Sequence, residues 1–287
     1  MTASALGLIL VAAFIHASWN YLLKRSGGGT VFVWLFATVS ALIYAPIAIV
    51  ALLWARPALG WVAVTLMLAS AVLHTAYYML LDRGYRSGGD LSLVYPLARG
   101  SGPLLTVCIA VVLLGERPSG IALVGAALIA CAVVLLTGHL SRLRDKGSLH
   151  AVVYALLTGC MIASYTVIDK IAVAAFAVPP ILQDWAANCG RVVLMTPLAL
   201  RRPEEIAQTW RRARKEIIAV AVLCPLSYIL VLTAMVFTPV SYVAPAREVS
   251  ILIAAVMGAQ LLREGETVRR LLAAAAMVAG IICLAVG

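Results

Sequence analysis

Charged and polar side chains recur at helical spacing inside long apolar segments, and one segment carries three of them on a single face. Asp184, Asn188 and Arg191 are spaced i, i+4 and i+7, which places them on one side of a helix. A charge inside a membrane costs about 2.5–3.5 kcal/mol by insertion scales, so this face looks into the protein or into a water-filled cavity. The stripe either forms an internal Asp184–Arg191 ion pair that fixes packing or lines a cavity that binds a solute, and we favour the cavity.

Two histidines sit at helical spacing beside aromatic or polar partners. His16 shares a face with Trp19 and Asn20, and His74 shares one with Tyr78. A histidine inside a membrane span either packs through hydrogen bonds or carries protons, since its side chain titrates near physiological pH. Both interpretations stay open, and the second makes these histidines candidates for coupling transport to protons.

The other notable intramembrane charges are two arginines with aromatic or acidic neighbours. Arg99 lies one turn after Tyr95, and Arg247 is followed directly by Glu248. Arginine binds carboxylate or phosphonate groups through its fork of donors, while an acidic side chain such as Asp184 suits an amine. The mixed signs predict a zwitterion or a small organic anion as the substrate.

Together these patterns predict one central substrate cavity, with no catalytic residue and no metal ligand. The side chains expected to wall it are His16, Trp19, Asn20, His74, Tyr78, Tyr95, Arg99, Trp185, Asn188, Arg191, Tyr228, Arg247 and Glu248. The candidates for proton coupling are His16, His74, Asp184 and Glu248.

The composition says which elements must position these side chains. Of 287 residues, 63% are hydrophobic and 12% are charged, about half the roughly 25% charge of a soluble domain. The mean hydropathy is +1.03. No soluble fold hides that much apolar surface, which excludes a nucleic-acid-binding protein, a secreted disulfide scaffold and a disordered chain. The chain is predicted to be an all-α integral membrane protein.

Ten segments are apolar and long enough, at about 20 residues, to cross a bilayer as helices. They leave no room for a catalytic or receptor domain outside the membrane. The expected spans are 3–23, 30–53, 61–81, 91–114, 119–138, 149–168, 179–200, 216–238, 240–262 and 267–286.

The basic residues predict the orientation. Sixteen of the 22 lie in turns after odd-numbered spans, counting Arg269 and Arg270 at the start of the tenth span with the turn before it, and 3 lie in turns after even-numbered ones. Cytoplasmic loops carry the excess of Lys and Arg, so both termini are expected outside a bacterial-type cytoplasmic (inner) membrane. The segment 201–215 holds six of the sixteen and is expected to lie on anionic lipid headgroups, each basic residue contributing about 1 kcal/mol.

The two halves of the chain resemble each other in order and spacing. Trp34 precedes Pro46 by twelve residues, and Trp185 precedes Pro197 by the same interval. An odd number of spans per unit delivers the second copy upside down, and inverted repeats around a midplane site are a common plan for secondary transporters. We therefore expect two inverted five-helix repeats, 1–140 and 147–287. The matched positions are Trp19 and Tyr165, Lys24 and Lys170, Trp34 and Trp185, Arg99 and Arg247, and Glu116 and Glu264.

Several motifs resemble those of EamA-domain proteins in the drug/metabolite transporter superfamily. They are His16-Ala17-Ser18-Trp19-Asn20, Tyr95-Pro96-Leu97-Ala98-Arg99-Gly100, Gly115-Glu116-Arg117 and Val243-Ala244-Pro245-Ala246-Arg247-Glu248-Val249-Ser250. The resemblance covers nearly the whole chain and implies a ten-span transporter of small organic molecules. It also implies cytoplasmic termini, against the charge count, which we follow here. Arg263 stands where the family has a glycine before Glu264.

The expected function is a secondary transporter, an exporter of a small polar, zwitterionic or anionic metabolite such as an amino-acid-like compound, working by alternating access. The alternative is a membrane-embedded lipid flippase or headgroup enzyme. The sequence has no phosphate-binding G-x-x-x-x-G-K-[ST] and no H-E-x-x-H, so we expect no ATP-driven pump and no metal site. We also expect no enzyme activity and no cofactor. Expected partners are the substrate, membrane lipids and protons, with no nucleic acid, in a monomer or homodimer.

Overall fold

The computed structural model describes residues 1–86, 91–137, 148–253 and 267–287. The protein is 88% helical and has no strand in these ranges. The helices are α1 (Ala3–Ser26), α2 (Thr30–Ala55), α3 (Trp61–Arg86), α4 (Leu91–Leu113), α5 (Gly120–Thr137), α6 (Ser148–Ala174), α7 (Pro180–Ala199), α8 (Pro203–Phe237), α9 (Val240–Ala246) and α11 (Thr267–Val286).

Glycine and proline set several of the helix boundaries. Gly27, Gly28 and Gly29 all have positive φ, at 84°, 57° and 98°, a conformation that residues with a Cβ rarely adopt, so α1 ends there. Pro180 and Pro203 each open a helix, where the missing N–H costs no hydrogen bond. Most predicted spans agree with the helices to within a few residues at each end.

Helix α8 departs from the prediction at its start. The span was expected from residue 216, but the helix begins at Pro203, because the basic segment 201–215 is largely helical and not a turn. Ala213 has non-helical angles, φ −128° and ψ 23°, so the first ten residues form a helical arm joined to the span by a kink. The proposed contact of this arm with lipid headgroups stays a prediction.

The ninth span is broken at the residues of greatest chemical interest. Helix α9 ends at Ala246, and Arg247 and Glu248 form a turn before helical residues resume at Val249. Glu248, Ser250 and Ile251 each donate their backbone N–H to the carbonyl three residues earlier, as in a 3₁₀ turn. The rest of the predicted span, 254–262, lies outside the described residues.

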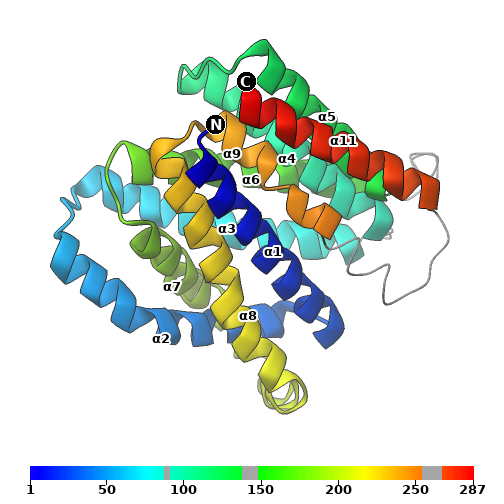
Figure 1. The fold of residues 1–287 in the computed structure, drawn as a ribbon. Coiled ribbons are helices and arrows are strands. Elements are labelled where there is room, and N and C mark those ends of the chain that lie inside the picture. Colours follow the sequence, from blue (N-terminus) through cyan, green and yellow to red (C-terminus); the bar gives the residue numbers. More distant parts are fainter. Residues whose placement is uncertain (87–90, 138–147, 254–266) are drawn as a thin grey trace.

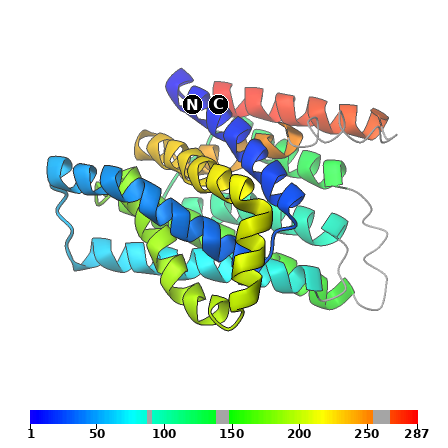
Figure 2. The same cartoon turned by 90° about the horizontal axis from the view of Figure 1, so that it is seen from below.

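The bundle packs in pairs from the two halves of the chain. Helix α3 lies against α6 and α1 against α8, while α2 packs on α7, α4 on α9 and α5 on α11 (Figure 1). Gly125 and Gly280 bring α5 and α11 together so closely that a Cβ on either would lie 2.7–2.8 Å from the backbone oxygen of the other. The N- and C-termini lie side by side, as Figure 2 also shows, and the Met1 amino group is 3.4 Å from the Ala285 carbonyl oxygen.

Apolar side chains cover the outside of the bundle and polar ones lie within it. Leu42, Trp54 and Val112 are 70%, 89% and 78% exposed, whereas Asp169, Gln183 and Glu248 are at most 1% exposed. This distribution fits a protein whose surroundings are lipid. The described helices long and apolar enough to cross a membrane are Ala3–Leu23, Thr30–Ala55, Trp61–Leu81, His150–Ala174 and Pro203–Phe237.

Candidate functional site

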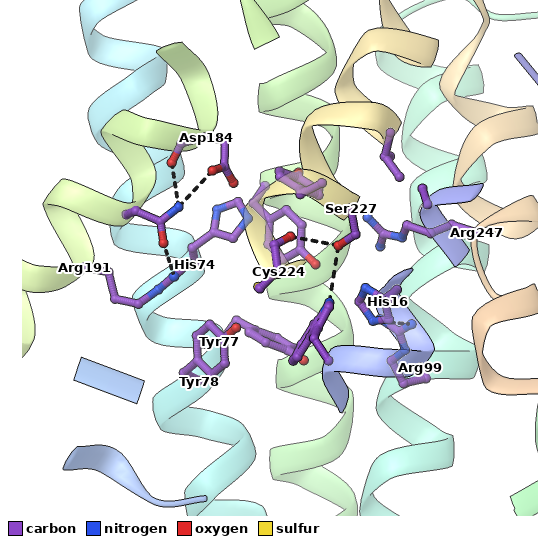
Figure 3. A pocket seen from close by; sticks show the side chains of 16 residues that line it. His16, His74, Tyr77, Tyr78, Arg99, Asp184, Arg191, Cys224, Ser227 and Arg247 are labelled. Carbon is purple, nitrogen blue, oxygen red and sulfur yellow. Dashed lines mark hydrogen bonds between the residues drawn. The ribbon is translucent and has the colours of Figure 1, made fainter. Parts of the chain in front are cut away.

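A cavity lies among the helices and is lined by polar and aromatic side chains. Its volume of about 60 Å³ holds about four waters at roughly 10–15 Å³ each. Figure 3 shows Asp184 and Arg191 on one side and Arg99 and Arg247 on the other. The lining residues are Ala12, His16, Trp19, His74, Tyr77, Tyr78, Arg99, Tyr165, Asp184, Asn188, Arg191, Cys224, Ser227, Tyr228, Val231 and Arg247.

The α7 side of the cavity is a chain of three polar side chains. The Asn188 amide donates to the Asp184 carboxylate at 2.9 Å, and Arg191 Nη1 donates to the Asn188 amide oxygen at 2.8 Å. The Arg191 guanidinium also lies 4.8 Å from the centre of the Tyr78 ring, a cation–π distance. Asn188 therefore connects the acid and the base, in place of the direct Asp184–Arg191 ion pair that was the alternative from sequence.

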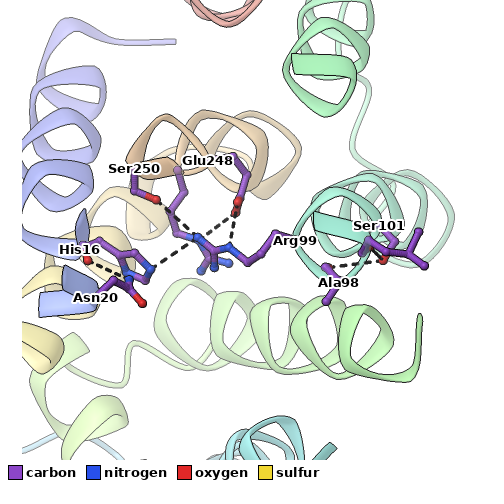
Figure 4. A network of polar contacts seen from close by, with 9 residues as sticks. His16, Asn20, Ala98, Arg99, Ser101, Glu248 and Ser250 are labelled. Carbon is purple, nitrogen blue, oxygen red and sulfur yellow. Dashed lines mark hydrogen bonds and ion pairs between the residues drawn. The ribbon is translucent and has the colours of Figure 1, made fainter. Parts of the chain in front are cut away.

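The opposite side holds a buried ionic network at the break after α9. Arg99 Nε lies 3.1 Å from Glu248 Oε2, and Arg247 Nε lies 3.9 Å from Glu248 Oε1. Arg99 Nη2 is 3.4 Å from the Ser250 hydroxyl and 3.5 Å from His16 Nε2 (Figure 4). Two guanidinium groups thus share one carboxylate, which leaves a net positive charge at this end of the cavity.

Aromatic rings form the wall between the two charged ends. The His74 ring stacks on Tyr165 with centroids 3.9 Å apart, and Tyr228 meets both rings edge-on. Trp19 donates its indole N–H to the Ser227 hydroxyl at 3.3 Å. The cavity therefore offers cationic and acidic groups at its ends and flat apolar surfaces between them.

Comparison with known protein families gives a match for the second half of the chain. Residues 149–286 match the model of the EamA-like transporter family. This half of the chain is an EamA-like transporter domain. The family consists of membrane transporters of the drug/metabolite transporter superfamily, and the predicted resemblance is confirmed over these residues. Together with the apolar helices, the match indicates a multi-pass membrane protein.

A crystal structure of another protein shares the fold of this chain. The two superpose with a TM-score of 0.79 at 15% sequence identity, over 100% of this chain and 98% of the other. No curated protein matches the sequence. At this identity the likeness concerns the fold alone.

Most of the side chains singled out from sequence meet at the cavity. Three of the others lie elsewhere. Asn20 donates to the His16 carbonyl oxygen, Trp185 donates to the Ala41 carbonyl oxygen, and Glu248 lies against Arg99 outside the lining. The Tyr95 side chain lies outside the described part of the chain. The predicted site residues that line the cavity are His16, Trp19, His74, Tyr78, Arg99, Asp184, Asn188, Arg191, Tyr228 and Arg247.

The cavity also contains side chains that the sequence prediction of the site left out. Tyr165 occupies the position matched to Trp19 in the other half, so the repeat itself was the signal that identifies it. Cys224 and Ser227 share a helical face with Tyr228. Asp169, directly behind the wall, was missed because the sixth span was expected to end at residue 168, whereas α6 continues to Ala174.

Proposed function

We propose that this EamA-like transporter moves a small zwitterionic or anionic metabolite, such as an amino-acid-like compound, out of the cell by alternating access around the cavity. The main observation behind this proposal is a pair of buried arginines on opposite sides of the cavity, each with an N–H group that lacks a hydrogen-bond acceptor in the described part of the chain. Arg191 Nε and Arg247 Nη2 are buried and have no hydrogen-bond partner among the described residues. A buried unpaired donor costs about 1–3 kcal/mol, so a bound anion or cavity water completes each site.

The distribution of charge supports a substrate with both signs. Arg247 offers its free donors to a carboxylate, while Asp184 at the other end is held by Asn188 and remains available to an amine. The stacked His74 and Tyr165 rings between them suit the apolar body of such a molecule. The cavity as described is too small for a metabolite, since it holds about four waters, so substrate entry requires the helices to move apart.

The packing of the two halves supports an inverted repeat of 1–140 and 147–287. Trp34 in α2 donates its indole N–H to the Thr196 hydroxyl of α7 at 3.0 Å, and its counterpart Trp185 in α7 donates to the Ala41 carbonyl oxygen of α2 at 2.9 Å. Likewise α3 packs on α6 and α1 packs on α8, and exchanging the halves interconverts these two contacts. Two equivalent halves give two nearly equivalent states, one open to each side.

The orientation belongs to the same proposal. Both termini lie at one end of the bundle, as an even number of crossings requires. The excess of basic residues that the sequence places after odd-numbered spans supports termini outside a bacterial inner membrane.

A screen of small metabolites by thermal unfolding tests the proposed substrate class. A ligand that binds the folded state stabilises it by about 2.7 kcal/mol at a hundred times its dissociation constant. We expect amino-acid-like zwitterions or small carboxylates to raise the unfolding temperature of the purified transporter. A screen in which only hydrophobic cations or lipid headgroups stabilise the protein argues for a different substrate class, the second of these for a lipid-moving protein.

A further inference from the structure

A fully buried carboxylate lies directly behind the cavity wall, on α6. Asp169 is 0% exposed. Its Oδ1 accepts a hydrogen bond from the Gln183 amide at 2.8 Å, and its Oδ2 accepts one from the Tyr228 hydroxyl. The Ser70 hydroxyl of α3 lies close by and is within hydrogen-bond distance of His74 Nδ1. All these donors are neutral, and no ion pair joins Asp169 to another described residue.

Two polar routes connect Asp169 to the cavity. Tyr228 lines the cavity and bonds directly to the carboxylate. On the other route, the Ser70 hydroxyl lies 3.1 Å from His74 Nδ1, and the His74 ring faces the cavity. A proton passed from Tyr228 to Oδ2 is replaced at the hydroxyl by one from cavity water, so the tyrosine ends each transfer unchanged.

The cluster accommodates both protonation states of the carboxyl group. The ionised carboxylate accepts a hydrogen bond from Gln183 Nε2 in the structure. A protonated Asp169 needs an acceptor, and Gln183 Oε1 is buried without a hydrogen-bond partner among the described residues. A half-turn of the amide, whose oxygen and nitrogen are nearly equal in shape, presents that oxygen to the new O–H. An ionised carboxylate without a cation partner is costly to bury, so the protonated state is readily reached.

The fold itself does not require a carboxylate here. The offset that matches Tyr165 to Trp19 matches Asp169 to Leu23 in the first half of the chain. The offset that matches Trp185 to Trp34 matches Gln183 to Phe32. Both counterparts are apolar. The other half of the molecule packs these counterparts in a hydrophobic cluster that includes Leu23, Phe32, Tyr78 and Val220. Tyr78 and Val220 come from α3 and α8, the same two helices that supply Ser70 and Tyr228 to Asp169. An apolar version of the cluster therefore exists in the same molecule, and the polar version points to a function.

The charged and titratable groups around Asp169 come from every helix packed against α6. Helix α7 brings Asp184, α3 brings His74, and α8 brings Tyr228 with Cys224. Arg247, after α9, lines the same cavity as Tyr228 and His74. On α4, Arg99 is engaged by Glu248.

We propose that Asp169, with Gln183 and Tyr228 as its hydrogen-bond partners, is the site that binds and releases the proton coupled to transport. The proposal rests on the proposed transport function and adds to it a coupling site distinct from the arginines that hold the substrate. The site faces the cavity through Tyr228 and His74, so a change in cavity hydration changes its exchange with water.

Infrared difference spectroscopy of the purified full-length protein tests this site with protons alone as the probe. We expect a carboxylic-acid C=O band that loses intensity as the pH rises, because the ionised carboxylate lacks this band. The band should be absent from Asp169→Asn and from Asp169→Leu, which imitates the other half. It should persist in Asp184→Asn, the matched control on the cavity wall. A titrating band unchanged in Asp169→Asn overturns the proposal, as does a band that responds only to added Na⁺.

A second variant keeps the test decisive if the Asp169 variants do not fold. Tyr228→Phe removes one donor from the ionised carboxylate, so the same band should persist and titrate at higher pH. An unshifted titration contradicts the assignment. Because the readout needs no substrate, a negative result here leaves the metabolite screen unaffected, and a failed screen leaves this titration unaffected.

Discussion

Replacing Glu248 with glutamine should lower the free energy of unfolding by about 3–5 kcal/mol, the effect of removing one partner from a buried ion pair. The Glu248 side chain is 1% exposed and is shared by Arg99 at 3.1 Å and Arg247 at 3.9 Å. Without its charge, two guanidinium groups remain buried beside each other with no compensating carboxylate. The measurement is denaturation of the purified protein in detergent.

Two further variants show whether the loss comes from the charge network. Glu205→Gln breaks an exposed pair with Arg202 at 3.2 Å, in which the side chains are 43% and 52% exposed, and exposed pairs contribute only about 0–1 kcal/mol. The double variant Arg99→Gln with Glu248→Gln should recover part of the stability, because it removes one unpaired cation. If Glu248→Gln behaves like Glu205→Gln, the network at the break after α9 does not hold the bundle together.

Replacing Arg191 with alanine should abolish transport while the protein stays folded in the membrane. Arg191 makes no ion pair with a described residue and bonds instead to Asn188 and the Tyr78 ring, so its removal strands no opposite charge. Losing a buried charged contact to a substrate costs about 2–5 kcal/mol, which corresponds to a fall in affinity of about 30-fold or more. The assay is flux in proteoliposomes of the metabolite that the screen identifies.

Arg202→Gln is the matched control for this variant, since it removes an arginine that is 52% exposed and distant from the cavity lining. Elution of Arg191→Ala as a monodisperse species on size-exclusion chromatography establishes that it is folded. Wild-type flux in the folded Arg191→Ala protein removes Arg191 from the substrate site.

The sequence was sufficient for the position of most helices and for most of the side chains that line the cavity, because both follow from local rules. Glycine and proline mark helix ends whatever the tertiary structure, and a charge inside an apolar segment must turn inward. The stripe of Asp184, Asn188 and Arg191 therefore lines the cavity as its spacing predicts. The start of α8 was placed too late, because hydropathy locates the apolar span and says little about a charged helical arm that precedes it.

The remaining features depend on contacts that spacing along one helix does not encode. Trp185 lies one residue after Asp184, yet its indole turns to the Ala41 carbonyl oxygen of α2. The partners of Asp169 lie 14 and 59 residues away on α7 and α8, so no local pattern joins them. Asn188 hydrogen-bonds to both Asp184 and Arg191, so these two residues do not form the direct ion pair that their spacing also allowed.

The most direct test of alternating access uses a cysteine that is already in the cavity. Cys224 lines it, and replacing the other five cysteines with serine leaves Cys224 as the only thiol. A membrane-impermeant thiol reagent is applied to intact cells and, separately, to inside-out membrane vesicles. The cysteine-free protein is the control. Alternating access predicts labelling of Cys224 from both faces, and the metabolite found in the screen should reduce it. Labelling from one face only, or from neither, would contradict alternating access around this cavity.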